Sequence, residues 1–241
     1  METRTLKTHL DWMEEGTALF AEGLSLLDPD DHDRPSQLGG WSVAQLIAHV
    51  NSNARALLNL TVWARTGFET PMYPSDDRRA QDIEKGSKQP LGVLIEDYFL
   101  SSREFLEGIT SLPLEKLDYR VKSARGRDIP VSEAVWIRIR EVWIHAVDLG
   151  VGIEFSRFPN ELQEALLDDV VLSFAVRNDP PRIELIANDA SKAWRTSESA
   201  DATKVEGGQS EILAWLLGRS SGQGLRCGTP DGRLPTLPPW L

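Results

Sequence analysis

The stretch Arg138-Ile139-Arg140-Glu141-Val142-Trp143-Ile144-His145-Ala146-Val147-Asp148 decides the fold. It contains no glycine or proline, and its largely apolar pattern predicts a buried helix. Four residues make slightly more than one helical turn, so Glu141 and His145 project from the same face. A carboxylate and an imidazole this close in an apolar helix are costly to desolvate unless something pairs with both. A divalent metal would do so, and it would need a third ligand from another helix.

The best candidate for the third ligand is His49, in the apolar helical run Leu46-Ile47-Ala48-His49-Val50. Two imidazoles and one carboxylate suit zinc in an open catalytic site. The same set suits non-haem iron, and ligand identity alone does not separate the two metals. The competing interpretations are a hydrogen-bonded core histidine at position 49 and ordinary surface polarity for the Glu141–His145 pair.

Four long amphipathic helices are expected in the first part of the chain. Ser42 and Gln45 form a capping box at the start of the second helix, and Ser132 and Glu133 suggest a cap for the last. The predicted ranges are 6–27, 41–67, 90–110 and 132–149, with an irregular link at 69–74, a short polar helix at 75–89 and a stretch at 112–131 that is broken by Pro113, Gly126 and Pro130. We therefore predict a mainly α fold, a four-helix bundle whose interior can hold metal ligands.

Past Gly150 the pattern changes to a smaller α+β unit. We place the two domains at 1–152 and 153–241, the first binding metal and the second contributing to the active site. In the second domain we expect helices at 160–177 and 210–217, with Ser210 as N-cap and Gly218 as C-cap. Short strands are expected at 183–187, 193–196, 202–206 and 225–227.

Charge and composition exclude several classes of partner. The net charge of -11 and the pI near 4.9 argue against nucleic acid, which needs a basic surface. The sequence contains no run of about 18 apolar residues, so no membrane span is predicted. The N-terminus does not resemble a signal peptide. With Cys227 as its one cysteine, the chain is expected to be cytoplasmic. The sequence does not reveal the oligomeric state, and a monomer is compatible with it.

Several segments resemble the mycothiol-dependent maleylpyruvate isomerases, members of the DinB-like superfamily of metal-binding bundles. The similarity covers nearly the whole chain and is most specific in the segment that contains Glu141 and His145. The segments that carry it are Trp41–Val50, Trp63–Tyr73, Arg138–Leu149, Gly218-Arg219 and the terminal Pro238-Pro239-Trp240-Leu241.

The resemblance implies a zinc ion held by His49, Glu141 and His145, with the thiol of mycothiol at the fourth position. It implies conversion of maleylpyruvate to fumarylpyruvate in gentisate breakdown, with Arg219 as an essential arginine that reaches into the site. Zinc lowers the pKa of a bound thiol, and the resulting thiolate can add to the cis double bond. Rotation about the temporary single bond and expulsion of the thiolate then give the trans isomer.

Other residues and activities stay open at this stage. Asn53, Arg138 and Asp148 are candidates for orienting the ligands or lining the substrate site, with ordinary buried or ionic contacts as the alternative. Without the resemblance, Arg219 is better explained as a cation near the end of its helix. The rival functions are another metal-dependent thiol transferase of this superfamily and a non-catalytic metal-binding module. Another thiol than mycothiol, or another divalent metal than zinc, also fits.

Overall fold

The structure is a computed structural model that describes residues 3–240. The chain divides into two compact units, one ending at Ile153 and the other starting at Glu154. Among the described residues, no helix is long and apolar enough to cross a membrane.

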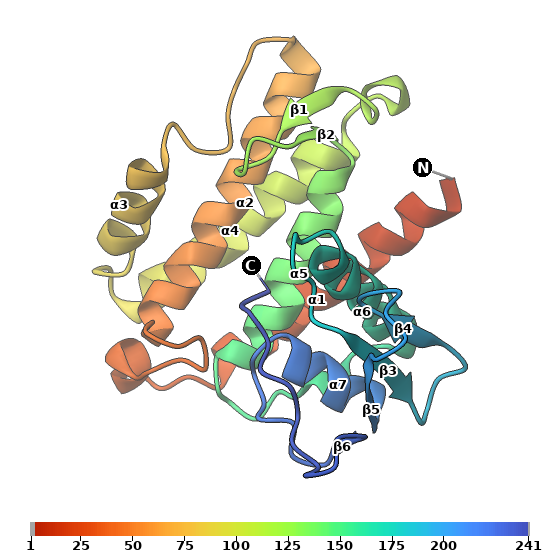
Figure 1. The fold of residues 1–241 in the computed structure, drawn as a ribbon. Coiled ribbons are helices and arrows are strands. Elements are labelled where there is room, and N and C mark those ends of the chain that lie inside the picture. The colour runs from red at the N-terminus through yellow and green to blue at the C-terminus, as the bar shows by residue number, and fades with distance from the viewer. Residues whose placement is uncertain (1–2, 241) are drawn as a thin grey trace. The chain divides into compact units, whose positions relative to one another are not determined.

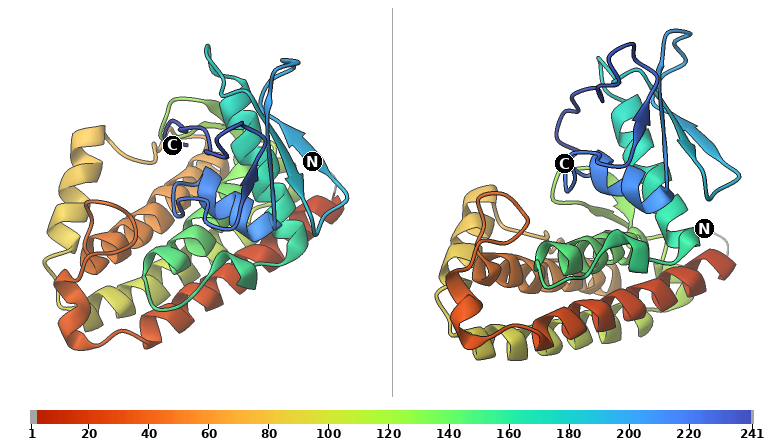
Figure 2. Two further views of the ribbon diagram at one scale, coloured as in Figure 1. Left: turned by 60° about the horizontal axis from the view of Figure 1, so that its bottom comes forward. Right: turned by 90° about the horizontal axis from the view of Figure 1, so that it is seen from below.

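The first unit is the expected four-helix bundle (Figures 1 and 2). Helix α2 contacts both α4 and α5, and α1 packs along α5. The four long helices are α1 (Thr3–Ser25), α2 (Val43–Thr66), α4 (Leu91–Thr110) and α5 (Glu133–Asp148), with the short helix α3 (Asp76–Gly86) packed against α2 and a 3₁₀ turn at Pro29–Asp33.

Close packing of α1 on α5 depends on a glycine. A Cβ atom at Gly16 would lie 2.4 Å from the indole nitrogen of Trp143, so a larger residue would push the helices apart. The same indole nitrogen donates a hydrogen bond to the carbonyl of Trp12, at 2.7 Å. This contact fixes α5, and with it the metal-ligand candidates, against α1.

The start of α2 confirms the predicted capping box. Ser42 Oγ accepts from the Gln45 backbone N–H, and the Gln45 side chain accepts from the Ser42 N–H. The helix ends at Gly67, whose φ of 78° is the left-handed conformation that favours glycine. Both ends of the helix that carries His49 are therefore determined locally.

Two local details of the first unit go beyond the prediction. Ser132 is at the N-cap of α5 and Glu133 is in its first turn, as predicted, but Ser132 has helical backbone geometry and its side chain makes no capping hydrogen bond. The stretch at 112–131 contains a 3₁₀ turn at Leu114–Lys116 and a small antiparallel hairpin, β1 (Arg120–Lys122) with β2 (Asp128–Pro130). Three-residue strands carry too little alternation to be recognised in a sequence.

The second unit is α+β, as expected. Its four-stranded sheet has the order β4-β3-β5-β6, with β3 parallel to β5 and the other pairs antiparallel. Helices α6 and α7 contact each other and the sheet. The elements are a 3₁₀ turn at Phe155–Arg157, α6 (Asn160–Ala175), β3 (Ile183–Ala187), β4 (Ala193–Arg195), β5 (Thr203–Gly207), α7 (Gln209–Leu216) and β6 (Arg226–Cys227).

The ends of α7 differ from the prediction. The helix begins at Gln209, with Gly208 rather than Ser210 at the N-cap. The Glu211 side chain accepts from the Gly208 N–H, and Asp189 accepts from the Gln209 N–H. These carboxylates replace the serine hydroxyl as partners of the first amide groups. At the other end, the C-cap is Leu217, and Gly218 follows it with a φ of 73°.

Candidate metal centre

His49, Glu141 and His145 converge inside the bundle. One ligand atom from each lies within 4.8 Å of the others. His49 comes from α2, while Glu141 and His145 lie one turn apart on α5, so the candidate ligands of two distant segments meet as predicted. The rings of His49 and His145 lie 5.2 Å apart, edge to face, and Trp41 lies edge-on to His49 at 5.3 Å.

The carboxylate of Glu141 lies between the two imidazoles. Its Oε2 is 2.9 Å from His49 Nε2 and 3.2 Å from His145 Nε2. This oxygen is buried and has no hydrogen bond of acceptable geometry. The two ion pairs leave this buried oxygen without a hydrogen bond, and a cation shared with both nitrogens would satisfy it.

Asp148 orients His145. Its Oδ2 lies 2.8 Å from His145 Nδ1, and the Asp148 carboxylate is wholly buried. This hydrogen bond places a proton on Nδ1 and leaves the lone pair of Nε2 facing Glu141 when the ring is neutral. An imidazole held by a carboxylate on its other nitrogen is the usual arrangement of a metal ligand.

The electrostatics of the three groups differ. Burial lowers the pKa of His49, although Glu141 opposes the effect. Burial also acts against the ionised form of Glu141, but the two histidines outweigh it and hold the pKa of Glu141 well below its ordinary value. For His145, burial is outweighed by Asp148 and Glu141, which raise its pKa to about 9. The cluster therefore offers one neutral imidazole, one carboxylate and one imidazole that must lose a proton to bind a metal.

These residues fit a divalent metal. His49 is 6% exposed, whereas Glu141 and His145 are only partly buried, so solvent reaches one side of the cluster. A set of three ligands with an open side is the pattern of a catalytic zinc site rather than a structural one.

Arg79 and Tyr73 also lie at the cluster, and the sequence did not reveal them. Arg79 Nη2, from α3, lies 3.3 Å from His49 Nδ1. The Arg79 guanidinium lies 5.7 Å from the centre of the Tyr73 ring. Burial, together with the charge of Glu141, raises the pKa of Tyr73, so its hydroxyl keeps its proton at neutral pH. A cation and a hydroxyl donor therefore lie next to the ligands.

The remaining predicted residues divide into two groups. Arg138 and Asn53 lie inside the bundle, where Arg138 Nη1 donates to Asn53 Oδ1 at 3.2 Å. Arg219 belongs to the second unit, directly after α7, and its Nη1 donates to the carbonyl of Leu217 at 2.7 Å. That contact matches the helix-end role considered for it, and its catalytic role stays a prediction.

Comparisons with known proteins agree with this architecture. Residues 13–150 match the family model of the mycothiol maleylpyruvate isomerase N-terminal domain. A crystal structure of the mycothiol-dependent maleylpyruvate isomerase is 32% identical, with a TM-score of 0.92 and 100% of both chains covered. A histidine-to-alanine mutant of that isomerase is 31% identical, with the same TM-score and coverage. No match was found among curated proteins. Because the family model covers more than half of its length, the chain belongs to the mycothiol maleylpyruvate isomerase family.

Proposed function

We propose that this protein is a thiol-dependent cis-trans isomerase that converts maleylpyruvate to fumarylpyruvate with mycothiol as cosubstrate. The observation that carries the proposal is the convergence of His49, Glu141 and His145 within 4.8 Å, in a chain similar over its full length to an isomerase of this kind. The family membership supports the substrate and the thiol, and the geometry supports the metal.

The metal that we propose is zinc, held by His49, Glu141 and His145. When bound, zinc would lower the pKa of a coordinated thiol so that the thiolate is present at neutral pH. The donor set does not exclude iron(II), which accepts the same combination of two imidazoles and a carboxylate. The buried oxygen of Glu141, which contacts both histidines but has no hydrogen bond, supports a resident cation of either kind.

Asp148 and Arg79 would each act on a different histidine, Asp148 on His145 and Arg79 on His49. Asp148 keeps a proton on His145 Nδ1, which makes Nε2 available. Arg79 can only donate, so its contact with His49 Nδ1 requires that nitrogen to be unprotonated. Ligation through His49 Nε2 would place a proton on Nδ1, and the guanidinium of Arg79 would then be released from this contact.

A guanidinium released beside the ligands is suited to the substrate. Maleylpyruvate carries carboxylates, and arginine binds a carboxylate in a bidentate manner. The overall charge of -11 repels an anion, so a local cation has to attract it. We therefore propose that Arg79 binds a substrate carboxylate, with the Tyr73 hydroxyl as an additional donor.

Arg219 is proposed as the catalytic arginine. While the double bond is transiently saturated, negative charge develops on the oxygen of the conjugated carbonyl. A fixed cation or donor that stabilises such a charge accounts for a large part of the rate in comparable reactions. The arginine that directly follows α7 is the residue that the family resemblance assigns to this task.

An ultraviolet assay of maleylpyruvate tests the function. The protein would be assayed with mycothiol, with glutathione and without thiol, each with zinc-loaded and chelator-treated enzyme. We expect isomerisation with mycothiol and zinc, and loss of activity when either is removed. Turnover that needs neither would contradict the proposal. Accumulation of a substrate–thiol adduct would identify a thiol transferase instead.

A further inference from the structure

Arg138 is a buried guanidinium in the centre of the bundle. It is 1% exposed and lies on α5, three residues before Glu141 and seven before His145, on the same helix face. Its Nη1 donates to the carbonyl of Val50 at 2.8 Å and to Asn53, and its Nη2 donates to Ser102 Oγ on α4 at 2.9 Å. One side chain therefore links three of the four long helices.

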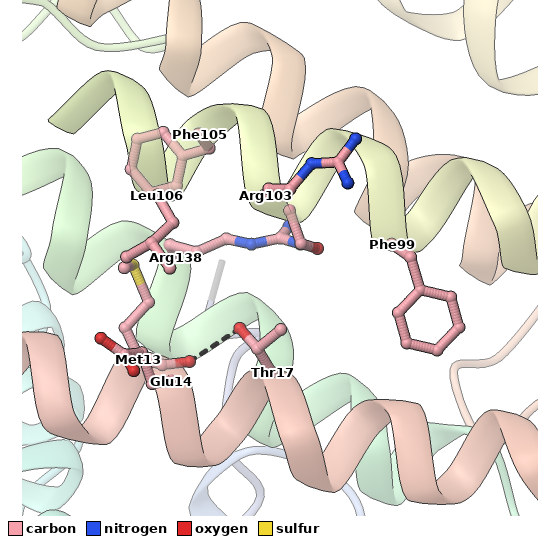
Figure 3. A pocket seen from close by; sticks show the side chains of 9 residues that line it. Met13, Glu14, Thr17, Phe99, Arg103, Phe105, Leu106 and Arg138 are labelled. Carbon is pink, nitrogen blue, oxygen red and sulfur yellow. Dashed lines mark hydrogen bonds between the residues drawn. The ribbon is translucent and has the colours of Figure 1, made fainter. Parts of the chain in front are cut away.

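Arg138 has no carboxylate partner. No Asp or Glu within the described residues forms an ion pair with it, and the centre of the Tyr98 ring lies 5.9 Å from its guanidinium carbon. Beside it lies a cavity of about 210 Å³ between α1 and α4, with a largely apolar wall (Figure 3). Arginine stays charged in proteins, so this burial carries a desolvation cost. Such a cost suggests a role beyond packing.

The acceptors of Arg138 show what it constrains. Val50 directly follows His49, and Asn53 lies one turn later on α2. The carbonyl of Val50 is part of the helix backbone, so the bond fixes the main chain beside the ligand rather than a flexible side chain. The donor lies one turn before Glu141 on α5. The guanidinium thus spans the two segments that must keep a set distance for three ligands to meet one ion.

We propose that Arg138 is a positioning residue that holds the His49 turn of α2 in register with Glu141 and His145 on α5, and so sets the affinity of the metal centre. This inference rests on the proposed metal site.

The test is zinc affinity, measured by competition with a chromophoric chelator on purified full-length protein. Arg138→Lys keeps the charge but loses the two-pronged donor geometry of the guanidinium, and Arg138→Met removes both. Asn53→Ala removes one acceptor on α2. We expect zinc affinity to fall roughly 10–100-fold for both Arg138 variants, the range for groups that orient metal ligands, and less for Asn53→Ala. The cobalt-loaded variants should also show a visible spectrum altered from that of the wild type.

Two control variants separate positioning from general stability. Arg65→Met removes the donors from Arg65 on α2 to the Gly108 and Ser111 carbonyls of the α4 end, which also link two helices. Ser102→Ala removes only the α4 partner of Arg138. Both should bind zinc like the wild type. Melting of the metal-free proteins reports folding, and if Arg138→Met does not fold, Arg138→Lys and Asn53→Ala decide.

Folded Arg138→Lys and Asn53→Ala proteins with wild-type zinc affinity and cobalt spectra would overturn the inference alone. Equal losses in the Arg65→Met control would overturn it as well, because the effect would then reflect bundle stability. A wild-type protein that binds no zinc or other divalent metal would overturn the metal proposal itself, and this inference with it.

Discussion

His145 Nδ1 and Asp148 Oδ2 lie 2.8 Å apart, three residues from each other on α5. Asp148 is wholly buried at the last residue of the helix, and its charge is directed at the imidazole. The pair decides which nitrogen of His145 carries the proton, and therefore which nitrogen faces Glu141 and His49. This contact fixes the orientation of the His145 ring.

Replacing Asp148 with asparagine is expected to weaken metal binding. The amide is a poorer acceptor and can present its NH₂ group to the ring, which would favour the wrong tautomer. We expect zinc affinity to fall about 10–100-fold, as for other groups that orient metal-binding histidines. Titration against a chelator measures the loss. Asp128→Asn is the matched control, since Asp128 accepts from Arg120 on the exposed hairpin of β1 and β2. Unchanged affinity in Asp148→Asn would show that Asp148 does not orient the ligand.

As pH rises, the stability of the metal-free protein should fall, whereas its apparent affinity for zinc should rise. The pKa of His145 is raised from 6.5 to about 9, mainly by Asp148 and Glu141 against the effect of burial. A raised folded-state pKa stabilises the metal-free protein below pH 6.5, and this stabilisation is lost as pH rises to about 9.

The proton on His145 also competes with the metal. Apparent zinc affinity should rise with pH, by up to about tenfold per unit, and level off near the pKa of His145. Thermal melting with and without chelator, across this pH range, measures both trends. A pH-independent melting temperature for the metal-free protein, together with a pH-independent affinity, would contradict the assignment of the proton to His145.

Much of the candidate metal site was predictable because each candidate ligand belongs to a regular helix. The spacing of Glu141 and His145 places them on one face in any α-helix. His49 could be paired with them because its helix is apolar and capped by Ser42, so it had to enter a core. The convergence itself required the bundle fold, which the four amphipathic segments implied.

The partners of those ligands were not predictable. Arg79 lies on α3, a polar helix in which it has no pattern to distinguish it from Arg78. Its contact with His49 depends on how α3 packs against α2, a tertiary relationship across a proline-containing loop. The hydrogen bonds of Arg138 across the bundle likewise depend on the relative register of α2, α4 and α5, which helical periodicity does not specify.

Arg79→Met is expected to weaken substrate binding while leaving the metal in place. Loss of the guanidinium removes the proposed carboxylate partner, so KM for maleylpyruvate should rise by about tenfold or more, the cost of one charged hydrogen bond. Zinc content should not fall, since Arg79 contacts Nδ1 of His49 and not Nε2, the nitrogen proposed to bind the metal. Steady-state kinetics and metal analysis measure the two quantities.

Arg78→Met is the control for Arg79, because Arg78 is on the same helix and pairs with exposed Asp82. It should leave KM unchanged. An unchanged KM in Arg79→Met would remove Arg79 from the substrate site, and a loss of zinc would assign it a structural role at His49.

Arg219→Lys separates a catalytic arginine from a helix-end cation. Lysine can still donate to the carbonyl of Leu217, so the melting temperature of the second unit should change little. It cannot reproduce the bidentate fork, so kcat/KM should fall roughly 100-fold, the loss typical when one donor to a developing oxyanion is removed. Zinc content should remain that of the wild type. Arg226→Lys is the control, since Arg226 on β6 pairs with Glu206 at the surface. Wild-type turnover in Arg219→Lys would show that Arg219 is not the catalytic arginine and would favour its role as a cation at the helix end.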